Sequence, residues 1–208
     1  VYDIVPAVAR LPASTTRDGL TKLGANLASI LHGMRASDDT TANETMREHL
    51  AAVVPGFTDV VTEHLSDGSL TFRVVEDDLN SSMGPDQISD GTVRLLCFHA
   101  LMASAQAQQG RRAGVVCLEE PERGLHPWLI AELVESFRDY AAAGQVILTT
   151  HSPAVVAAAK PEEVVIVEKV NATTRTRRAS DREEVDIFLE RFTLGDLWLQ
   201  GRFGGVPD

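Results

Sequence analysis

A short apolar run that ends in two adjacent acids constrains the fold of this chain more than any other feature. Residues 115–118 read Val-Val-Cys-Leu, and they lie between Gly114 and the sequence Glu119, Glu120, Pro121. An apolar run of this length, rich in β-branched residues, predicts a strand buried on both faces, as in a parallel sheet. Open α/β sheets bind their ligands at the carboxyl ends of such strands. We therefore expect both carboxylates at a ligand-binding edge; the alternative is a solvated loop that simply ends the strand.

Two carboxylates at one strand end suit a site for a magnesium nucleotide. One acid can hold the metal or its water shell, and the other can orient and deprotonate an attacking water. Glu119 and Glu120 are the candidates for these two roles.

The composition is that of an ordinary globular protein. The 208 residues suffice for one core, or one core with a small lobe, and 44% of them are hydrophobic and 24% charged. No apolar run approaches the roughly 18 residues of a membrane-spanning helix, and no secretory signal is visible. Cys97 and Cys117 lie inside apolar runs, which predicts buried, reduced thiols and a cytoplasmic location. Since the chain begins with Val1, we expect a processed or truncated piece of a longer protein.

The net charge of −11 argues against a broad contact with nucleic acid, because proteins that grip a phosphate backbone carry a basic stripe. The one basic cluster follows a predicted strand over residues 164–170 and the turn-like Asn171. We interpret this cluster as part of a solvated hairpin in preference to a DNA contact, while DNA could bind elsewhere in a larger protein. The cluster comprises Arg175, Arg177, Arg178 and the nearby Arg182.

Residues 1–82 are predicted to form a helical and β-hairpin lobe. Asn43 is a good helix cap, and Asp67 with Gly68 favours a tight turn between two strands of alternating polarity. The expected elements are helices over residues 19–34 and 43–54 and strands over residues 57–65 and 69–76.

Residues 83–208 are predicted to form an α/β core with a parallel β-sheet flanked by helices. Helices that alternate with apolar strands indicate right-handed βαβ units, and we extend this expectation to residues 164–170. The tail from residue 194 is expected to be turn-rich. The expected elements are helices over residues 92–109, 127–143 and 182–192 and strands over residues 114–118, 145–149 and 164–170.

Two further features lie near the acidic strand end in this scheme. Ser89 or Asp90 can cap the helix that follows, and Gly91 lets a ligand approach the backbone closely, so free amides there suit a phosphate. His151 comes just past the next strand, where its imidazole is expected beside the acids and can contact a γ-phosphate. Taken alone, the first is an ordinary capped helix and the second a loop histidine.

The three motifs together resemble the carboxyl-terminal half of an ABC-type AAA-family ATPase, of the bacterial group allied to RecF, SMC and OLD ATPases. They are Ser-Asp-Gly-Thr-x-Arg, an apolar strand followed by Glu-Glu-Pro-Glu-x-Gly-Leu-His-Pro, and Thr-Thr-His-Ser-Pro, spanning Ser89 to His151. The resemblance implies an ABC-ATPase-like carboxyl-terminal lobe that uses ATP and Mg²⁺. The three motifs would be the signature, the Walker B strand with its D-loop, and the H-loop.

The resemblance also implies roles for individual residues. Glu120 matches the glutamate that polarises water, His151 matches the switch histidine, and Glu119 stands where most relatives have Asp in the magnesium shell. The signature, which contacts the γ-phosphate held by the opposite protomer, is matched by Ser89, Asp90 and Gly91. Contacts with the partner in the D-loop region, or support for the signature, are implied for Glu122, Gly124, His126 and Arg94.

A Walker A loop, Gly-x-x-x-x-Gly-Lys-Ser/Thr, is absent from these 208 residues. Residues 19–24 contain two glycines and Lys22, but we expect them on an amphipathic helix. Without that loop no backbone cradle and no lysine hold the β-phosphate. The resemblance therefore implies a missing amino-terminal Walker A lobe, and we expect the chain alone to bind ATP weakly and hydrolyse it poorly.

The complete enzyme is expected to work as a homodimer, or with a second ATPase head, that closes on ATP through the signature and D-loop face. Hydrolysis would then separate the heads and drive DNA handling, phage defence or another effector protein. Two other classes remain open. The chain could be a metal-dependent nuclease or phosphodiesterase, or a non-catalytic scaffold that kept the fold. The ligands of the nuclease would be Glu119, Glu120, Glu122, His126 and His151.

Overall fold

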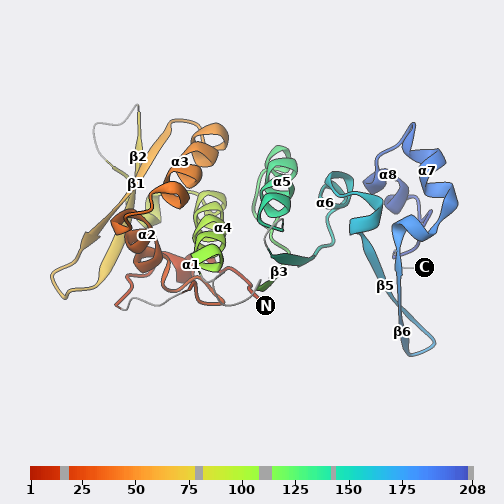
Figure 1. Cartoon of the computed structure of the whole chain (residues 1–208), viewed down its shortest axis with the longest axis horizontal. Helices are drawn as coiled ribbons and strands as arrows, with labels where there is room; N and C mark the ends of the chain where they lie inside the picture. Colours follow the sequence, from red (N-terminus) through yellow and green to blue (C-terminus); the bar gives the residue numbers. More distant parts are fainter. Residues whose placement is uncertain (15–18, 78–81, 108–113, 142–143, 206–208) are drawn as a thin grey trace. The chain divides into compact units, whose positions relative to one another are not determined.

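A computed structural model describes residues 1–14, 19–77, 82–107, 114–141 and 144–205 (Figure 1). The chain forms two compact units of mixed helices and strands. The first comprises Val1–Leu125 and Asp139–Thr149, and the second comprises His126–Arg138 and Thr150–Asp208. Each unit is described by itself below.

An antiparallel hairpin forms one layer of the first unit, as the alternating polarity predicts. β1 (Phe57–His64) pairs with β2 (Leu70–Glu76), and His64 faces Leu70 across the ladder. Leu70, Phe72 and Val74 are buried, so every second side chain of β2 enters the core. Asp67 accepts a hydrogen bond from the amide of Ser69 at 2.9 Å, and Gly68 adopts a φ of 83°, which closes the turn.

Two helices pack against this hairpin, and one of them starts later than predicted. α2 (Leu27–Ala36) buries Leu27, Ile30, Leu31 and Met34, but residues 19–26 form turns. The Asn26 side chain holds these turns by accepting from the amide of Thr21 at 2.8 Å and donating to the carbonyl of Gly19 at 3.0 Å. Lys22 therefore lies in a turn and not on a helix. α3 (Thr41–Val53) begins two residues before the predicted cap, Asn43.

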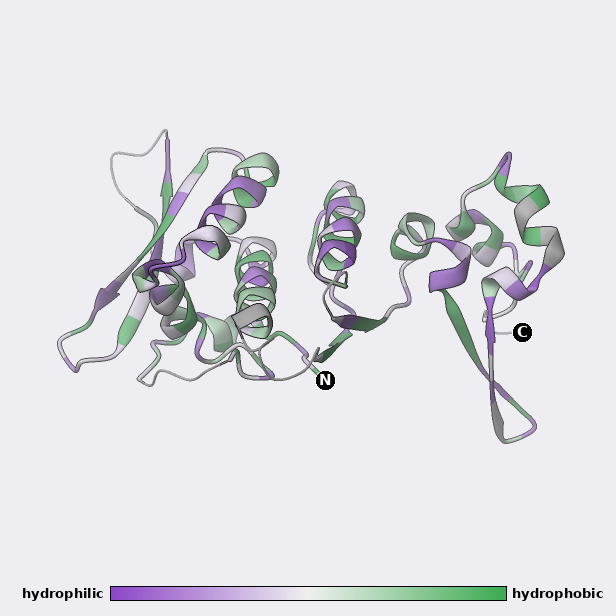
Figure 2. Ribbon diagram, viewed as in Figure 1, coloured by the Kyte–Doolittle hydropathy of each residue, from purple (hydrophilic) through white to green (hydrophobic). Residues whose placement is uncertain are grey.

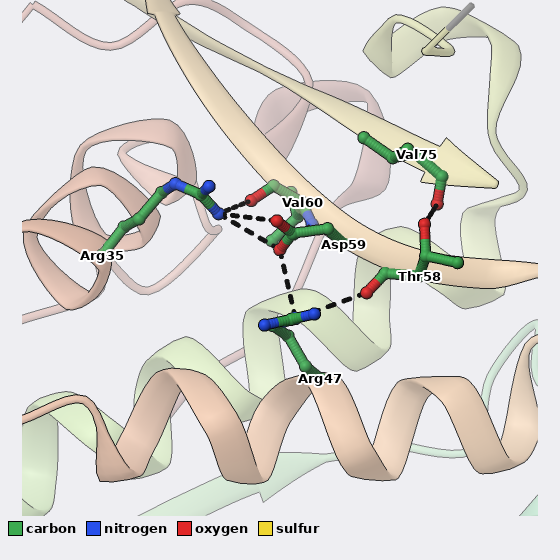
Figure 3. Close-up of polar contacts among 6 residues, drawn as sticks. All are labelled: Arg35, Arg47, Thr58, Asp59, Val60 and Val75. Carbon is green, nitrogen blue, oxygen red and sulfur yellow. Dashed lines mark hydrogen bonds and ion pairs between the residues drawn. The ribbon is translucent and has the colours of Figure 1, made fainter. Parts of the chain in front are cut away.

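Two arginines join α2 and α3 to β1 (Figure 3). Arg35 Nη1 lies 2.9 Å from Asp59 Oδ2, and Arg47 Nε lies 3.4 Å from Asp59 Oδ1. The same arginines donate to the carbonyls of Val60 and Thr58 at 3.1 and 3.3 Å. Asp59 lies where the register of the hairpin shifts, so the two helices fix an irregular part of the strand.

α4 (Asp90–Ala107) is the central helix of the first unit and contacts α1 (Pro6–Ala9), α2 and α3. Burial raises the pKa of Cys97 to about 12, so this thiol is an inert core residue, as predicted. Cys117 is a free thiol and only half-buried. The predicted helix end at Gln109 lies outside the described residues. Other buried hydrophobic side chains of α4 are Val93, Leu95, Leu96, Phe98, Ala100 and Leu101.

The sheet that carries the paired acids is parallel, as predicted. β3 (Val115–Glu119) pairs with β4 (Gln145–Thr149), and Glu119 faces Thr149. The opposite edge of β3 holds Tyr2, whose amide donates to the carbonyl of Cys117 at 2.7 Å and whose carbonyl accepts from Glu119 at 3.0 Å. This third, parallel partner was not predicted.

The prediction that β3 is buried on both faces is wrong. Val116 and Leu118 are buried, but Val115 is 56% exposed, and Ile147 on β4 is 48% exposed. Since side chains alternate between faces along a strand, the first unit by itself covers one face of this sheet.

The connection between β3 and β4 contains η2 (Pro127–Leu129) and α5 (Ile130–Ala141). It supplies the helix expected over residues 127–143, of which the last two lie outside the described residues. α5 crosses the boundary between the two units.

In the second unit, the prediction of a parallel strand over residues 164–170 is wrong. β5 (Val165–Val170) pairs antiparallel with β6 (Thr173–Arg178). Asn171 and Ala172 have φ values of 50° and 63°, and two left-handed residues make the tight turn that such a hairpin needs. Figure 2 shows that the apolar start of β5 lies beside a polar β6. Three arginines of the basic cluster, Arg175, Arg177 and Arg178, lie on β6 and so belong to a hairpin, as interpreted from the sequence.

Helices α6 (Pro153–Ala158), α7 (Glu183–Leu189) and α8 (Leu194–Leu199) complete the second unit, with η3 (Pro161–Glu163) and η4 (Ala179–Asp181). α7 is shorter than the helix predicted over residues 182–192. The tail predicted to be turn-rich instead starts with α8, because Thr193 and Asp196 form a capping box. The core of this unit is made by Val156, Ile166, Ala179, Val185, Leu194, Leu197 and Phe203.

Candidate functional site

The start of α4 is capped by Ser89, one of the two predicted caps. Its Oγ accepts a hydrogen bond from the amide of Thr92 at 3.0 Å and lies 2.9 Å from the Thr92 hydroxyl. A side-chain cap fixes the first turn and leaves the other free amides of the helix start directed along its axis. Such a start is favourable for an anion, because the helix dipole adds to the amides.

Gly91 brings this helix start against the turn that follows β3. A Cβ on Gly91 would lie 3.3 Å from the carbonyl oxygen of Gly124 and 3.4 Å from Cδ2 of Leu125. The first neighbour is backbone and cannot rotate away, so glycine permits the close approach. The structure therefore brings the predicted signature residues and the predicted D-loop residue Gly124 together within the first unit.

Glu120 has an unusual backbone. Its amide donates to the carbonyl of Thr149 at 2.9 Å, which extends the parallel ladder by one residue beyond β3. Its φ is 39°, in the left-handed region that non-glycine residues rarely occupy. Conformations of this kind cost on the order of 1–3 kcal/mol and cluster at functional sites. The chain thus turns sharply at the residue predicted to polarise water, whereas Glu119 completes the strand.

The side chain of Glu120 is held by a residue that the sequence analysis missed. Oε2 of Glu120 lies 2.6 Å from Nη2 and 3.2 Å from Nε of Arg123. This hydrogen-bonded contact raises the pKa of Arg123. The Arg123 side chain is 56% exposed and that of Glu120 30%, so the ion pair is accessible to solvent and weak. The only signal for this ion pair in the sequence was the three-residue spacing of Glu120 and Arg123 within a predicted turn.

Charges of both signs surround these motifs. Burial lowers the pKa of Arg94, and the positive charge of Arg123 lowers it further, while the carboxylates of Asp3 and Asp90 act in the opposite direction. Asp3 directly follows Tyr2, the residue paired with β3, and the carboxylates of Asp3 and Glu119 both raise the pKa of Arg123. Sequence analysis missed Asp3 because nothing in the sequence links residues 1–3 to β3.

The two predicted histidines belong to the second unit. His126 caps η2, where its Nδ1 accepts from the amide of Trp128 at 3.5 Å, and it is exposed. His151 is exposed and lies two residues after Thr149, the register partner of Glu119. Because Glu120 lies in the first unit, the expected proximity of His151 to Glu120 stays a prediction.

The strand-end acids suit magnesium better than a metal cage. Mg²⁺ prefers oxygen ligands, keeps several waters and needs only one or two protein carboxylates, which Glu119 and Glu120 supply. Among the described residues no three His, Cys, Asp or Glu side chains lie together as a set of metal ligands. No described helix is both long and apolar enough to cross a membrane.

The fold is similar to that of solved SMC ATPase heads. A structure from a study of ATP-driven dimerization and DNA-stimulated activation of SMC ATPases superposes with a TM-score of 0.54 at 15% identity, over 77% of this chain and 96% of that one. A Pyrococcus furiosus Smc head bound to the C-terminal domain of ScpA gives 0.53 at 15% identity, over 73% and 37%. A Pyrococcus yayanosii Smc head with a coiled coil and joint gives 0.52 at 17%, over 73% and 29%. The chain thus spans about a third of the two Pyrococcus proteins, and the likeness shows the fold.

No curated protein sequence matches the chain significantly. One protein family does, and its profile covers residues 33–157, which is more than half of the chain and includes Ser89, Glu120 and His151. The family match identifies a relative of AAA-type ATPases, and the head-like fold agrees with it. The chain belongs to the family described as "AAA domain, putative AbiEii toxin, Type IV TA system".

Proposed function

We propose that this chain is the part of an ATP-hydrolysing head that supplies the Walker B acids and the signature. The observation that carries the proposal is the strand end at Glu120. There a parallel ladder runs one residue past β3, and the backbone then turns through a left-handed conformation. Backbone strain at a strand end in a parallel sheet is typical of a ligand site.

In this proposal the protein acts by positioning charges and water. The Glu120 carboxylate would orient the attacking water and accept its proton. Glu119 would accept hydrogen bonds from the water shell of the metal. Bound Mg²⁺ supplies neutralisation of phosphate charge. His151 donates to the γ-phosphate from the segment after β4.

A second head is expected to complete the site. The Ser89 hydroxyl and the backbone amides of Asp90 and Gly91 would donate to the γ-phosphate on the opposite head, and the packing of Gly91 on Gly124 supports one continuous contact face there. Residues proposed to contact the partner are Glu122, Gly124 and His126. Arg94 is buried, so we propose that it supports the signature and does not face the partner. Homodimerisation on ATP, and coupling to DNA or to an effector protein, are parts of the same proposal.

The phosphate loop must come from other residues, because these 208 contain no Walker A sequence. The test is steady-state ATP turnover of the protein that carries both this chain and a phosphate loop, with Glu120→Gln as the variant. Loss of one water-orienting group is expected to lower the rate by about 10²–10⁴-fold. Glu48→Gln on the exposed face of α3 is the matched control and should leave the rate unchanged.

The 208-residue chain alone is expected to show no turnover. Turnover by the isolated chain that disappears with Glu120→Gln would overturn the requirement for a separate phosphate loop. Full turnover by the Glu120→Gln enzyme would overturn the proposed role of Glu120. Metal-dependent cleavage of DNA without nucleotide would instead favour the nuclease alternative.

A further inference from the structure

One arginine, distant in sequence from every nucleotide motif, holds the loop before α4. Arg10 directly follows α1. Its Nε donates to the carbonyl of Pro85 at 2.9 Å, and its Nη2 donates to the carbonyl of Ile88 at 2.9 Å. The same Nη2 lies 2.6 Å from Oδ1 of Asp90. A single guanidinium thus holds three acceptors of the segment that leads into α4.

These acceptors lie on both sides of Ser89. Pro85 is the first residue of η1 (Pro85–Gln87), Ile88 immediately precedes Ser89, and Asp90 is the first residue of α4. The clamp therefore fixes the backbone that enters and leaves the helix cap. The helix start has little room to shift toward the turn after β3, since a Cβ on Gly91 would already lie 3.3 Å from the carbonyl oxygen of Gly124.

The chemistry of the clamp requires arginine. The Arg10 side chain is 15% exposed, whereas that of Asp90 is 63% exposed. The bonds to the two carbonyls are shielded and hold the loop, while the exposed ion pair adds little. A planar guanidinium presents Nε and Nη2 in a fixed fork that reaches two carbonyls at once, and the single ammonium of lysine cannot reproduce this geometry.

The segment that carries Arg10 is anchored to the acidic strand. The amide of Arg10 donates to the carbonyl of Pro6 at 3.0 Å, which fixes the arginine at the end of α1. Tyr2 pairs with β3 through the carbonyl of Cys117 and the amide of Glu119, eight residues earlier in the same segment. Residues 1–10 thus contact β3 at one end and the Ser89 loop at the other.

We infer that Arg10 is a positioning residue, which sets the Ser89 helix start relative to the Glu119–Glu120 strand end. The clamp stands on these contacts alone, while its consequence for ATP rests on the proposed function. Loss of the clamp frees the loop, so that the helix start meets the nucleotide of the opposite head less often. Nucleotide binding by the phosphate-loop side of the same head does not depend on Arg10.

The first experiment measures amide hydrogen exchange in the 208-residue chain. Thr92 and Val93 donate to Ser89, so their amides report on the helix start. Arg10→Ala is expected to speed their exchange by about tenfold, the value of one to two net hydrogen bonds. Arg10→Lys is expected to speed the exchange of these amides nearly as much as Arg10→Ala does, because the forked guanidinium is lost while the charge remains.

Arg47→Ala is the matched control. Arg47 also donates to a carbonyl and pairs with a carboxylate, but it joins α3 to β1. It should leave exchange at Thr92 and Val93 unchanged. Slow exchange in the β1–β2 ladder verifies that each variant is folded, and Arg10→Lys decides the matter if Arg10→Ala does not fold. Unchanged exchange in a folded Arg10 variant overturns the clamp.

The second experiment uses the protein that carries the phosphate loop, in a Glu120→Gln background that retains ATP. ATP-dependent association of heads is measured by analytical ultracentrifugation, and binding of nucleotide by a single head is measured with a fluorescent ATP analogue. Arg10→Ala is expected to weaken association about tenfold and to leave single-head binding within about twofold. If Arg10→Ala speeds amide exchange at the helix start but leaves the association of heads as strong as with wild-type Arg10, the coupling between the clamp and head association is overturned. If heads with wild-type Arg10 do not associate when ATP is added, the proposed function is overturned. The hydrogen-exchange result on the clamp still holds in that case.

Discussion

Gly195 is expected to be indispensable to the packing of the second unit. It lies in the first turn of α8, and a Cβ there would lie 2.2 Å from the carbonyl oxygen of Pro153 and 3.1 Å from Cβ of Ala157. The first distance is about 1 Å short of ordinary contact, and the oxygen belongs to backbone. α6 and α8 must therefore separate to admit a methyl group.

The magnitude follows from two opposing effects. Alanine favours a helix over glycine by about 1 kcal/mol, but overpacking of a tight contact costs about 1–3 kcal/mol, and a backbone neighbour places this case at the upper end. We expect Gly195→Ala to lower the free energy of unfolding by about 2 kcal/mol. Gly33→Ala in α2 is the control, because no atom lies within 4 Å of its Cβ position, and it should stabilise by about 0.5–1 kcal/mol.

Urea denaturation followed by tryptophan fluorescence measures the effect. The two tryptophans of the chain, Trp128 and Trp198, both belong to the second unit, so the signal reports on the unit that contains Gly195. Far-UV circular dichroism reports on Gly33→Ala in the first unit. An unchanged fluorescence midpoint for Gly195→Ala would refute the close packing of α6 and α8.

Three further predictions concern single residues. Burial lowers the pKa of His99 from its ordinary value of 6.5 to about 4, with a smaller contribution from His49, so the protonated form is disfavoured in the folded state. The contribution of neutral His99 to the free energy of unfolding is therefore fully present above pH 6.5, and it should be lost as the pH falls from 6.5 to 4, by up to about 3 kcal/mol. The urea midpoint of His99→Gln should depend less on pH than that of the wild type. Ser89→Ala should lower the free energy of unfolding, measured by urea denaturation, by about 1 kcal/mol because a helix cap is lost, whereas Ser89→Asp should retain most of this stability. Gly204→Ala should destabilise the second unit by at least about 1 kcal/mol, because a φ of 81° strains any residue that has a side chain; an unchanged thermal midpoint would contradict this backbone conformation.

Periodicity and turn residues predicted the local elements well. The alternation in β2 and the Asp67–Gly68 turn identified the hairpin, and the apolar runs before Glu119 and Thr150 identified the parallel pair. These features depend on side chains close together in the sequence, which sequence patterns record directly. The capping role of Ser89 followed from the same local chemistry.

Contacts between distant segments were beyond the sequence. The pairing of Tyr2 with β3 and the reach of Arg10 to Ile88 join residues with no shared pattern. The antiparallel course of β5 was missed because an apolar strand after a helix also fits a parallel unit, and two non-glycine residues, Asn171 and Ala172, make its turn. The left-handed Glu120 is likewise set by its surroundings, since glutamate has no local preference for that region.

A mixing experiment tests the central proposal most directly. Ser89→Arg blocks the signature of a head, and Glu120→Gln disables its own water-orienting acid, so heads of either variant alone should not hydrolyse ATP. A mixed dimer regains one intact site, because wild-type Glu120 of one head meets wild-type Ser89 of the other. Equal mixing of the two variants, each carrying the phosphate loop, should restore about one quarter of the wild-type turnover, given random pairing in a twofold dimer. No recovery, with both variants shown to form dimers, would contradict a site shared between Glu120 of one head and Ser89 of the next.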